Sequence, residues 1–235
     1  MADGERWLFA PLGANVCYSP QADLVGGVAI TAIGVDAVRH AHRLHGHLAI
    51  AALPLILGAH QLDEAVVWFW QQGHVPRSIG ELALWVYLLI AFVLLPLFVP
   101  LAIVALEPTR RRRWSMAPFV AIGTGVAVVL FSAMVRGPVG VSARPYHLAY
   151  SLHVDGGFYL VSLYVVAVCG ALLLSGYRHV VIFGLVNLVA VAVIATLTVD
   201  GFASVWCGWA AVTSGAIALH MRLANPRHAT PSVLT

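Results

Sequence analysis

The chain has 235 residues, of which 60% are hydrophobic and only 10% charged, and its mean hydropathy is +0.88. Average soluble domains carry roughly 25% charged residues, so the composition excludes an ordinary soluble protein and indicates a polytopic membrane protein. All 13 basic residues are arginine, which excludes a rhodopsin-like pigment because its Schiff base requires a lysine. The net charge of +3 comes from loops, and we expect no nucleic-acid partner.

Apolar segments long enough to cross a bilayer recur along the chain. A crossing needs about 20 predominantly apolar residues, and the first 20 residues lack the pattern of a removable signal peptide. We expect an all-α fold, a seven-transmembrane-helix bundle over residues 21–222, with an N-terminal segment (1–20) and a tail (223–235). The predicted helices are 21–38, 48–71, 79–105, 115–135, 155–175, 179–199 and 202–222.

Arginine placement predicts how the bundle is oriented. Positively charged residues in short loops tend to stay in the cytoplasm, and nine of the 13 arginines fall in the first, third and fifth loops and the tail. The N-terminus is therefore expected outside and the C-terminus inside a bacterial cytoplasmic membrane. The run Arg110–Arg113 is interpreted as a topology anchor that contacts lipid headgroups.

The long connection 136–154 has a first half rich in Gly and Pro. Its second half is compatible with a short helix that has Tyr146, Tyr150 and His153 on one side. Such a segment would cap the outer mouth of the bundle; an interfacial aromatic anchor is the alternative interpretation.

The most informative stretch is Gly58–Trp70, in the second predicted helix. Ionisable groups inside a membrane are costly and usually face a bundle interior or a cavity, where they mark function. His60, Glu64 and Trp68 recur every four residues and share one helix face, with Asp63 beside them.

The predicted topology brings further acidic and aromatic residues to the outer half of the bundle. Because carboxylates avoid lipid, we expect these side chains to line one cavity. The acids are Asp63, Glu64, Glu81, Asp155 and Asp200, and the aromatic residues are Trp68, Trp85, Tyr159, Trp206 and Trp209.

Buried acids surrounded by aromatic rings suit one kind of chemistry. A carboxylic acid in an apolar cavity can keep its proton near neutral pH and act as a Brønsted acid. The faces of Trp and Tyr attract cations. This combination predicts protonation of an alkene or epoxide on a lipophilic substrate, followed by cyclisation through carbocations, with no metal or redox cofactor.

Three segments resemble a known group of proteins: Asn15–Asp23, the pattern His60-Gln61-x-x-Glu64-x-x-x-Trp68, and Asp200–Ala210. They are similar to bacterial seven-helix proteins that begin with Cys-Phe-Ser-Pro, many without an assigned role. Some members are membrane-bound terpene cyclases of indole-sesquiterpenoid and drimentine-type pathways. Size and helix number also resemble those of fungal membrane meroterpenoid cyclases.

The resemblance implies a terpene cyclase of the isomerase or lyase type. By position it gives the acid roles to Glu64 and Asp200, and we expect Asp63 and His60 to tune or reprotonate them. Trp68, Trp85, Tyr159, Trp206 and Trp209 would line the cation pocket. The implied substrate is a prenylated small molecule carried on indole or a diketopiperazine, supplied by an upstream prenyltransferase or epoxidase.

Two alternatives remain at this stage. An intramembrane zinc hydrolase needs about three convergent ligands, for which His60, His147 and His153 are candidates. A non-catalytic ligand-binding or transport protein would use a polar path, for which Asp36, Asn187 and Cys169 are the inner candidates. Asn187 is also a candidate for hydrogen bonding between helices.

Overall fold

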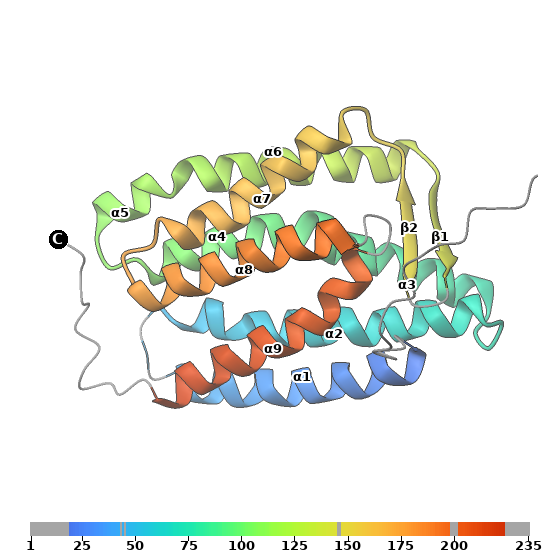
Figure 1. Ribbon diagram of the computed structural model, residues 1–235, viewed down its shortest axis with the longest axis horizontal. Helices are drawn as coiled ribbons and strands as arrows, with labels where there is room; N and C mark the ends of the chain where they lie inside the picture. The colour runs from blue at the N-terminus through green and yellow to red at the C-terminus, as the bar shows by residue number, and fades with distance from the viewer. Residues whose placement is uncertain (1–18, 43, 45, 145–146, 198–201, 224–235) are drawn as a thin grey trace, which may run out of the picture.

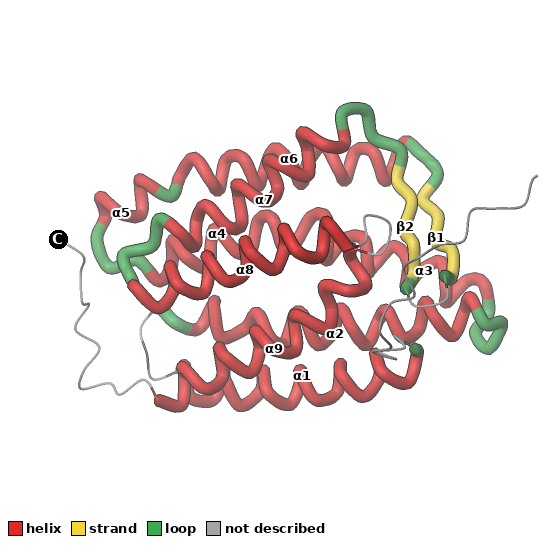
Figure 2. The backbone as a smooth tube through the Cα atoms, in the orientation of Figure 1, coloured by secondary structure: helices red, strands yellow, loops and turns green. Residues whose placement is uncertain are grey.

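The chain folds into a helical bundle with one small β-hairpin (Figures 1 and 2). The computed structural model describes residues 19–42, 44, 46–144, 147–197 and 202–223. The elements are α1 (Pro20–Ala41), α2 (Leu48–Gln71), α3 (Arg77–Leu89), the π-helical turn η1 (Ile90–Leu94), α4 (Leu95–Leu106), α5 (Arg110–Ser115), α6 (Ala117–Arg136), β1 (Val139–Ala143), β2 (Leu148–Leu152), α7 (Gly157–Leu173), α8 (Arg178–Leu197) and α9 (Phe202–Leu223).

The helical fold predicted from the sequence is confirmed. Among the described residues, five segments are long and apolar enough to cross a membrane, namely α1, α2, the continuous run Arg77–Leu106, the run Arg110–Arg136 and most of α8. Helix α7 is apolar but shorter, at 17 residues. The assignment to membrane proteins therefore holds in this general form, and seven crossings remain a prediction.

The predicted helix 79–105 is interrupted by the π-helical turn η1. Pro96 follows it on α4, and a proline has no N–H to give to the preceding turn. Wide turns of this kind release backbone carbonyls from the regular pattern. Here the carbonyl of Ala91 accepts a hydrogen bond from the Tyr164 hydroxyl of α7 at 2.9 Å, so the interruption also joins two helices.

The connection after α6 forms a β-hairpin, and the short helix expected in its second half is wrong. Strands β1 and β2 pair antiparallel, with Val141 opposite Tyr150. The apolar residues Leu148, Tyr150 and Leu152 alternate along β2, which is the period of a strand with one packed face. Tyr146 lies outside the described residues.

Glycines let α1 and α2 approach each other closely along their length. A Cβ atom at Gly27 would lie 2.9 Å from the backbone nitrogen of Leu62, and one at Gly34 would lie 2.7 Å from that of Leu55. Gly58 contributes the same kind of contact from α2, with Thr31 as its neighbour. Small residues are the usual means of close helix packing in membranes, where lipid is as apolar as the side chains.

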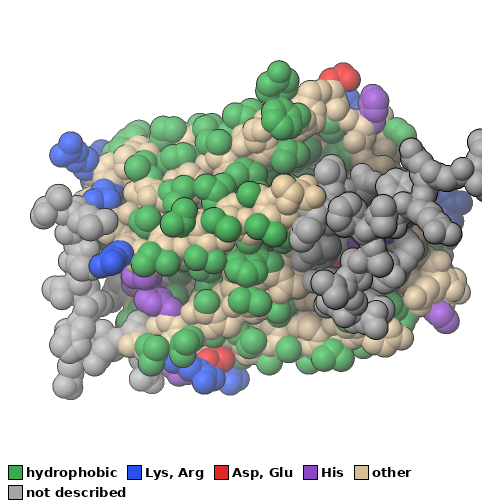
Figure 3. All heavy atoms as spheres, in the orientation of Figure 1, with side chains coloured by type: hydrophobic (Ala, Val, Ile, Leu, Met, Phe, Trp, Pro, Cys, Tyr) green, Lys and Arg blue, Asp and Glu red, His purple; other side chains and the backbone are tan. Residues whose placement is uncertain are grey.

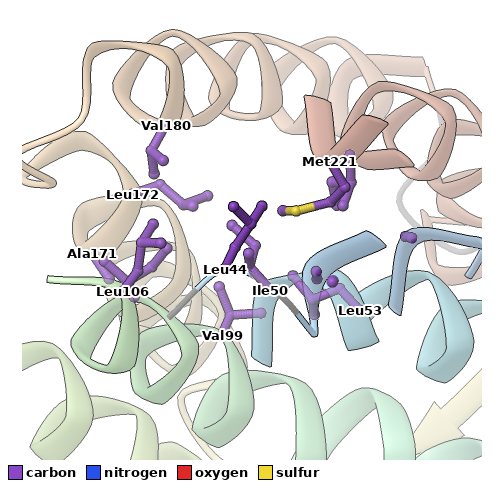
Figure 4. Close-up of a cluster of buried hydrophobic side chains, with 14 of the residues drawn as sticks. Leu44, Ile50, Leu53, Val99, Leu106, Ala171, Leu172, Val180 and Met221 are labelled. Atoms are coloured by element: carbon purple, nitrogen blue, oxygen red, sulfur yellow. The ribbon is translucent and has the colours of Figure 1, made fainter. Parts of the chain in front are cut away.

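The main apolar core lies near the end of the bundle where α1 ends and α2 begins. It combines side chains from α1, α2, α4, α7, α8 and α9, and Figure 4 shows Leu106, Ile50 and Met221 pointing toward its centre. Outward faces of α6, α7 and α8 carry exposed Val, Leu and Phe residues, seen as the hydrophobic surface in Figure 3. These faces suit contact with lipid.

Replacing Gly34 by Ala should destabilise the protein, because the new methyl group meets backbone that no rotamer change can move. Overpacking of this kind costs about 1–3 kcal/mol, so the thermal unfolding midpoint in detergent should fall. Gly125→Ala is the matched control, since a Cβ atom at that helical glycine meets nothing within 4 Å. Equal midpoints for the two variants would contradict the proposed helix contact.

Candidate functional site

Helix α2 directs most of its polar stretch into the bundle. His60, Gln61, Glu64 and Trp68 are all buried, and Glu64 is 0% exposed. They lie where α1 packs on one side of α2 and α3 on the other (Figure 1). Asp63 is half-buried. The expectation that this face points inward therefore agrees with the structure.

Helix α1 contributes an acid that sequence analysis did not assign to the site. Asp23 is 0% exposed, and its Oδ1 atom accepts a hydrogen bond from Nε2 of Gln61 at 3.3 Å. The indole of Trp68 also lies close to this carboxylate, but the pair falls short of hydrogen-bond geometry. Gly26 makes room for Gln61, because a Cβ atom there would lie 2.8 Å from Nε2.

The signal for Asp23 was present in the sequence but ambiguous. An acid in the first turn of a helix is ordinarily explained by the helix dipole, and Ser19 caps α1 just before it. The glycine pair Gly26-Gly27 that follows indicates close packing of that face.

Three stacked rings connect α2, α3 and the hairpin. The ring of His60 stacks on Tyr87 with 4.0 Å between centroids, and Tyr87 stacks on Tyr150 at 4.2 Å. Tyr87 is completely buried. The hairpin therefore covers this end of α2 and α3 through Tyr150 and the buried Leu148. Neither tyrosine was among the predicted site residues, although the segment that carries Tyr150 was expected to cap the outer mouth of the bundle.

Several buried polar atoms in this cluster have no hydrogen-bond partner among the described residues. They are Asp23 Oδ2, His60 Nδ1, Gln61 Oε1 and Asp63 Oδ2. A buried polar atom without a partner is costly, so such a group is suited to a polar ligand atom, water or an exchangeable proton. We define the acid cluster as Asp23, His60, Gln61, Asp63, Glu64, Trp68, Tyr87 and Tyr150.

Three residues predicted for the cavity wall lie elsewhere. The Glu81 side chain is 48% exposed and pairs with Arg77 one turn earlier, at 2.6 Å. Asp155 is exposed in the turn before α7, and Tyr159 is 74% exposed on the first turn of that helix. Helical spacing predicts which face of a helix each residue lies on. It does not predict whether another element packs against that face. Trp85 is half-buried and packs beside Tyr87 and Leu88.

Three predicted site residues lie at position 200 or within α9. Asp200 lies outside the described residues. Trp206 is half-buried, and the Trp209 indole donates to Oδ1 of Asn187 on α8 at 3.0 Å. Asn187 thus acts in interhelical hydrogen bonding, as one interpretation of the sequence suggested, and Trp209 faces α8.

A second buried acid lies in the loop between α4 and α5. Glu107 is 0% exposed, and its Oε1 atom accepts hydrogen bonds from the Ser175 hydroxyl at 2.7 Å and the Gly176 amide at 2.8 Å. Burial, together with the nearby Glu107 carboxylate, raises the pKa of Tyr177. These bonds join the α4–α5 loop to the α7–α8 loop, which gives Glu107 a structural role that sequence analysis missed.

The three histidines proposed as ligands of an intramembrane zinc hydrolase do not form a metal site in the described structure. Within the described part of the chain, no group of three or more His, Cys, Asp and Glu side chains is arranged to hold a metal ion. His60 is in the ring stack, His147 begins the second half of the hairpin and His153 is exposed.

Comparison with known protein families gives one match. A family described as of unknown function, DUF6629, matches residues 16–232. The chain belongs to this family. The match covers every helix and both strands, so the fold and the acid cluster lie inside the family region. No curated protein and no solved structure matches the chain.

Replacing Tyr150 by Ala should loosen the hairpin, because the ring stack with Tyr87 is lost. Aromatic pairs contribute about 0.5–1.5 kcal/mol beyond area burial, so amide hydrogen exchange of residues 147–152 should accelerate roughly 2- to 13-fold. Mass spectrometry of the detergent-solubilised protein measures this. Ser142→Ala, at an exposed position of β1, is the control, and identical exchange in both variants would argue against the stack.

Proposed function

We propose that this protein is a membrane-embedded terpene cyclase that protonates a lipophilic prenylated substrate. The observation that carries the proposal is the acid cluster. Asp23, Asp63 and Glu64 come from two helices in direct contact, and the rings of Tyr87 and Trp68 lie buried around them. Acid groups and aromatic faces in an apolar surrounding are the two requirements of carbocation chemistry.

Glu64 is the proposed proton donor. It is fully buried in the second half of α2, and His60 lies one turn before it on the same face. In the proposed reaction the Glu64 carboxylic acid gives its proton to an alkene carbon or an epoxide oxygen. A second alkene of the substrate then attacks the cation, and a carboxylate takes up a proton to form the final alkene. The product is an isomer of the substrate.

We propose Asp200, to which the resemblance gives the second acid role, as the carboxylate that accepts the final proton. Asp63 directly precedes Glu64 and Asp23 is hydrogen-bonded to Gln61 of the same helix, and each has a buried oxygen without a partner among the described residues. Either one would serve to return a proton to Glu64. Trp68, Tyr87 and Tyr150 would stabilise the cation through their ring faces.

Access to the cluster would require movement of the hairpin. The stack of His60, Tyr87 and Tyr150 fills the space next to the acids, so a substrate chain has to displace Tyr150 or enter beside it. Closing a site in this way also keeps water from a reactive cation. In this proposal the hairpin of β1 and β2 acts as the cover of the site.

The proposed setting is a bacterial cytoplasmic membrane with the N-terminus outside and the C-terminus inside. Lipophilic substrates reach an intramembrane site from the bilayer, and we propose that a prenyltransferase or an epoxidase supplies them. The ring system attached to the prenyl chain is proposed as indole or a diketopiperazine on the basis of resemblance alone.

Replacing Glu64 by Gln should abolish cyclisation, because the amide keeps the shape of the side chain but has no acidic proton. Losing a general acid typically costs 10²- to 10⁴-fold in rate. Membranes containing the protein would be supplied with 3-farnesylindole or its terminal epoxide. Cyclisation appears in gas chromatography–mass spectrometry as a new peak of unchanged mass.

Asp36→Asn is the matched control, because Asp36 lies at the other end of α1 and pairs with Arg222 near the surface. It should retain activity. Full activity of Glu64→Gln would exclude the proposed donor. Substrate binding without turnover by the wild-type protein would favour the non-catalytic alternative.

A further inference from the structure

We propose a second ligand site at the opposite end of the bundle, which binds a planar conjugated ring that carries carbonyl oxygens, the headgroup class of membrane quinones. The site is a cavity of about 180 Å³ between α2, α4, α8 and α9. Three histidines far apart in sequence, His47, His179 and His220, line it. This site takes no part in the proposed cyclisation.

The three histidines form a stacked group of rings. His179 and His220 stack with 4.3 Å between centroids, and His47 and His220 stack at 6.4 Å. Tyr177 extends the group, at 5.6 Å from His179. Metal ligands direct their nitrogen atoms at one point, but no metal-holding group occurs within the described residues. Stacked planar rings are suited to a planar organic ligand.

The remaining wall of the cavity is apolar. Ile50, Leu106, Val180 and Phe183 are among the lining residues, and the first three, labelled in Figure 4, also belong to the main core. An apolar cavity of about 150 Å³ binds benzene, so about 180 Å³ is sufficient for a somewhat larger ring. The cavity is partly open, and His179 is exposed at its edge. In this proposal an apolar tail attached to the ring leaves the cavity at this open edge.

Positive charge near the cavity favours a ligand that carries oxygen atoms with partial negative charge. Among the described residues no carboxylate lines the cavity, while Arg178 precedes His179 and Arg222 follows two residues after His220. Of the acids near this end, Asp36 is paired with Arg222 and Glu107 accepts hydrogen bonds from Ser175 and Gly176. Figure 3 shows histidine side chains flanked by basic side chains at this end.

The ring nitrogens of His179 and His220 are available to a ligand. Neither side chain makes a hydrogen bond to another described residue. A neutral imidazole has one N–H donor and one acceptor, and a carbonyl oxygen is a suitable partner for the donor. Recognition in this proposal therefore combines stacking on the imidazole rings with a hydrogen bond from His179 or His220.

The two proposed sites can be tested separately because α2 keeps them apart. His47 precedes the first residue of α2 and Glu64 lies near its other end. At a rise of 1.5 Å per residue, the two positions are about 25 Å apart along the helix. A negative result for cyclisation therefore does not bear on menadione binding, and a negative result for menadione binding does not bear on cyclisation.

The test measures binding of menadione to the full chain in lipid nanodiscs by equilibrium dialysis. A double variant, His179→Phe with His220→Phe, keeps both rings but removes their N–H groups, and should weaken binding about ten-fold or more. 2-Methylnaphthalene, which has the same rings without carbonyl oxygens, should bind more weakly than menadione and should be insensitive to the double variant.

Two further variants complete the test. Ala216→Trp fills the cavity from an exposed position of α9 and should abolish menadione binding without altering the core. His153→Phe, at an exposed position next to the hairpin, should have no effect. Unchanged menadione binding in Ala216→Trp would overturn the site. Lost binding in Ala216→Trp with unchanged binding in the double variant would overturn recognition by the histidines.

Discussion

The close contact between α1 and α2 is the interaction on which the acid cluster depends. Glycine at 27, 34 and 58 brings the two backbones together, and this approach buries Asp23 against Gln61. In lipid no water is available to solvate these groups, so the hydrogen bond from Gln61 offsets part of the cost of burying the Asp23 carboxylate. A wider gap between α1 and α2 would leave Asp23 and the polar face of α2 without that hydrogen bond.

The two ends of the bundle differ in charge and in chemistry. One end has buried acids under the hairpin, and the other has arginines, the histidine-lined cavity and the Glu107 hydrogen bonds. The distribution of arginines, from which the membrane orientation is predicted, therefore also distinguishes the ends that carry the two proposed sites. Glu107 joins the α4–α5 loop to the α7–α8 loop by hydrogen bonds, which helps to keep the second end compact.

Sequence patterns predicted the helices well where apolar runs are bounded by polar residues. The bounds 48–71 agree with α2, and the inward face of Glu64 followed from the cost of an acid in lipid. Position on a helix could not reveal partners from distant elements. Asp23 and Tyr150 belong to the site because they contact Gln61 and Tyr87 on other elements. Glu81 and Tyr159 do not belong to it, because their side chains are exposed. The interruption at Ile90–Leu94 was hidden in an unbroken apolar run.

The polar pairing of α1 with α2 has a consequence for how the protein enters the membrane. Their mean hydropathies are 1.4 and 1.3, against 2.9 for the run Arg77–Leu106 and 2.3 for α8. Each alone would expose an acid to lipid during insertion, which costs several kcal/mol per unsatisfied polar group. Because only a short connection joins Ala41 to Leu48, we expect the two helices to enter the membrane more favourably as an antiparallel pair than one after the other.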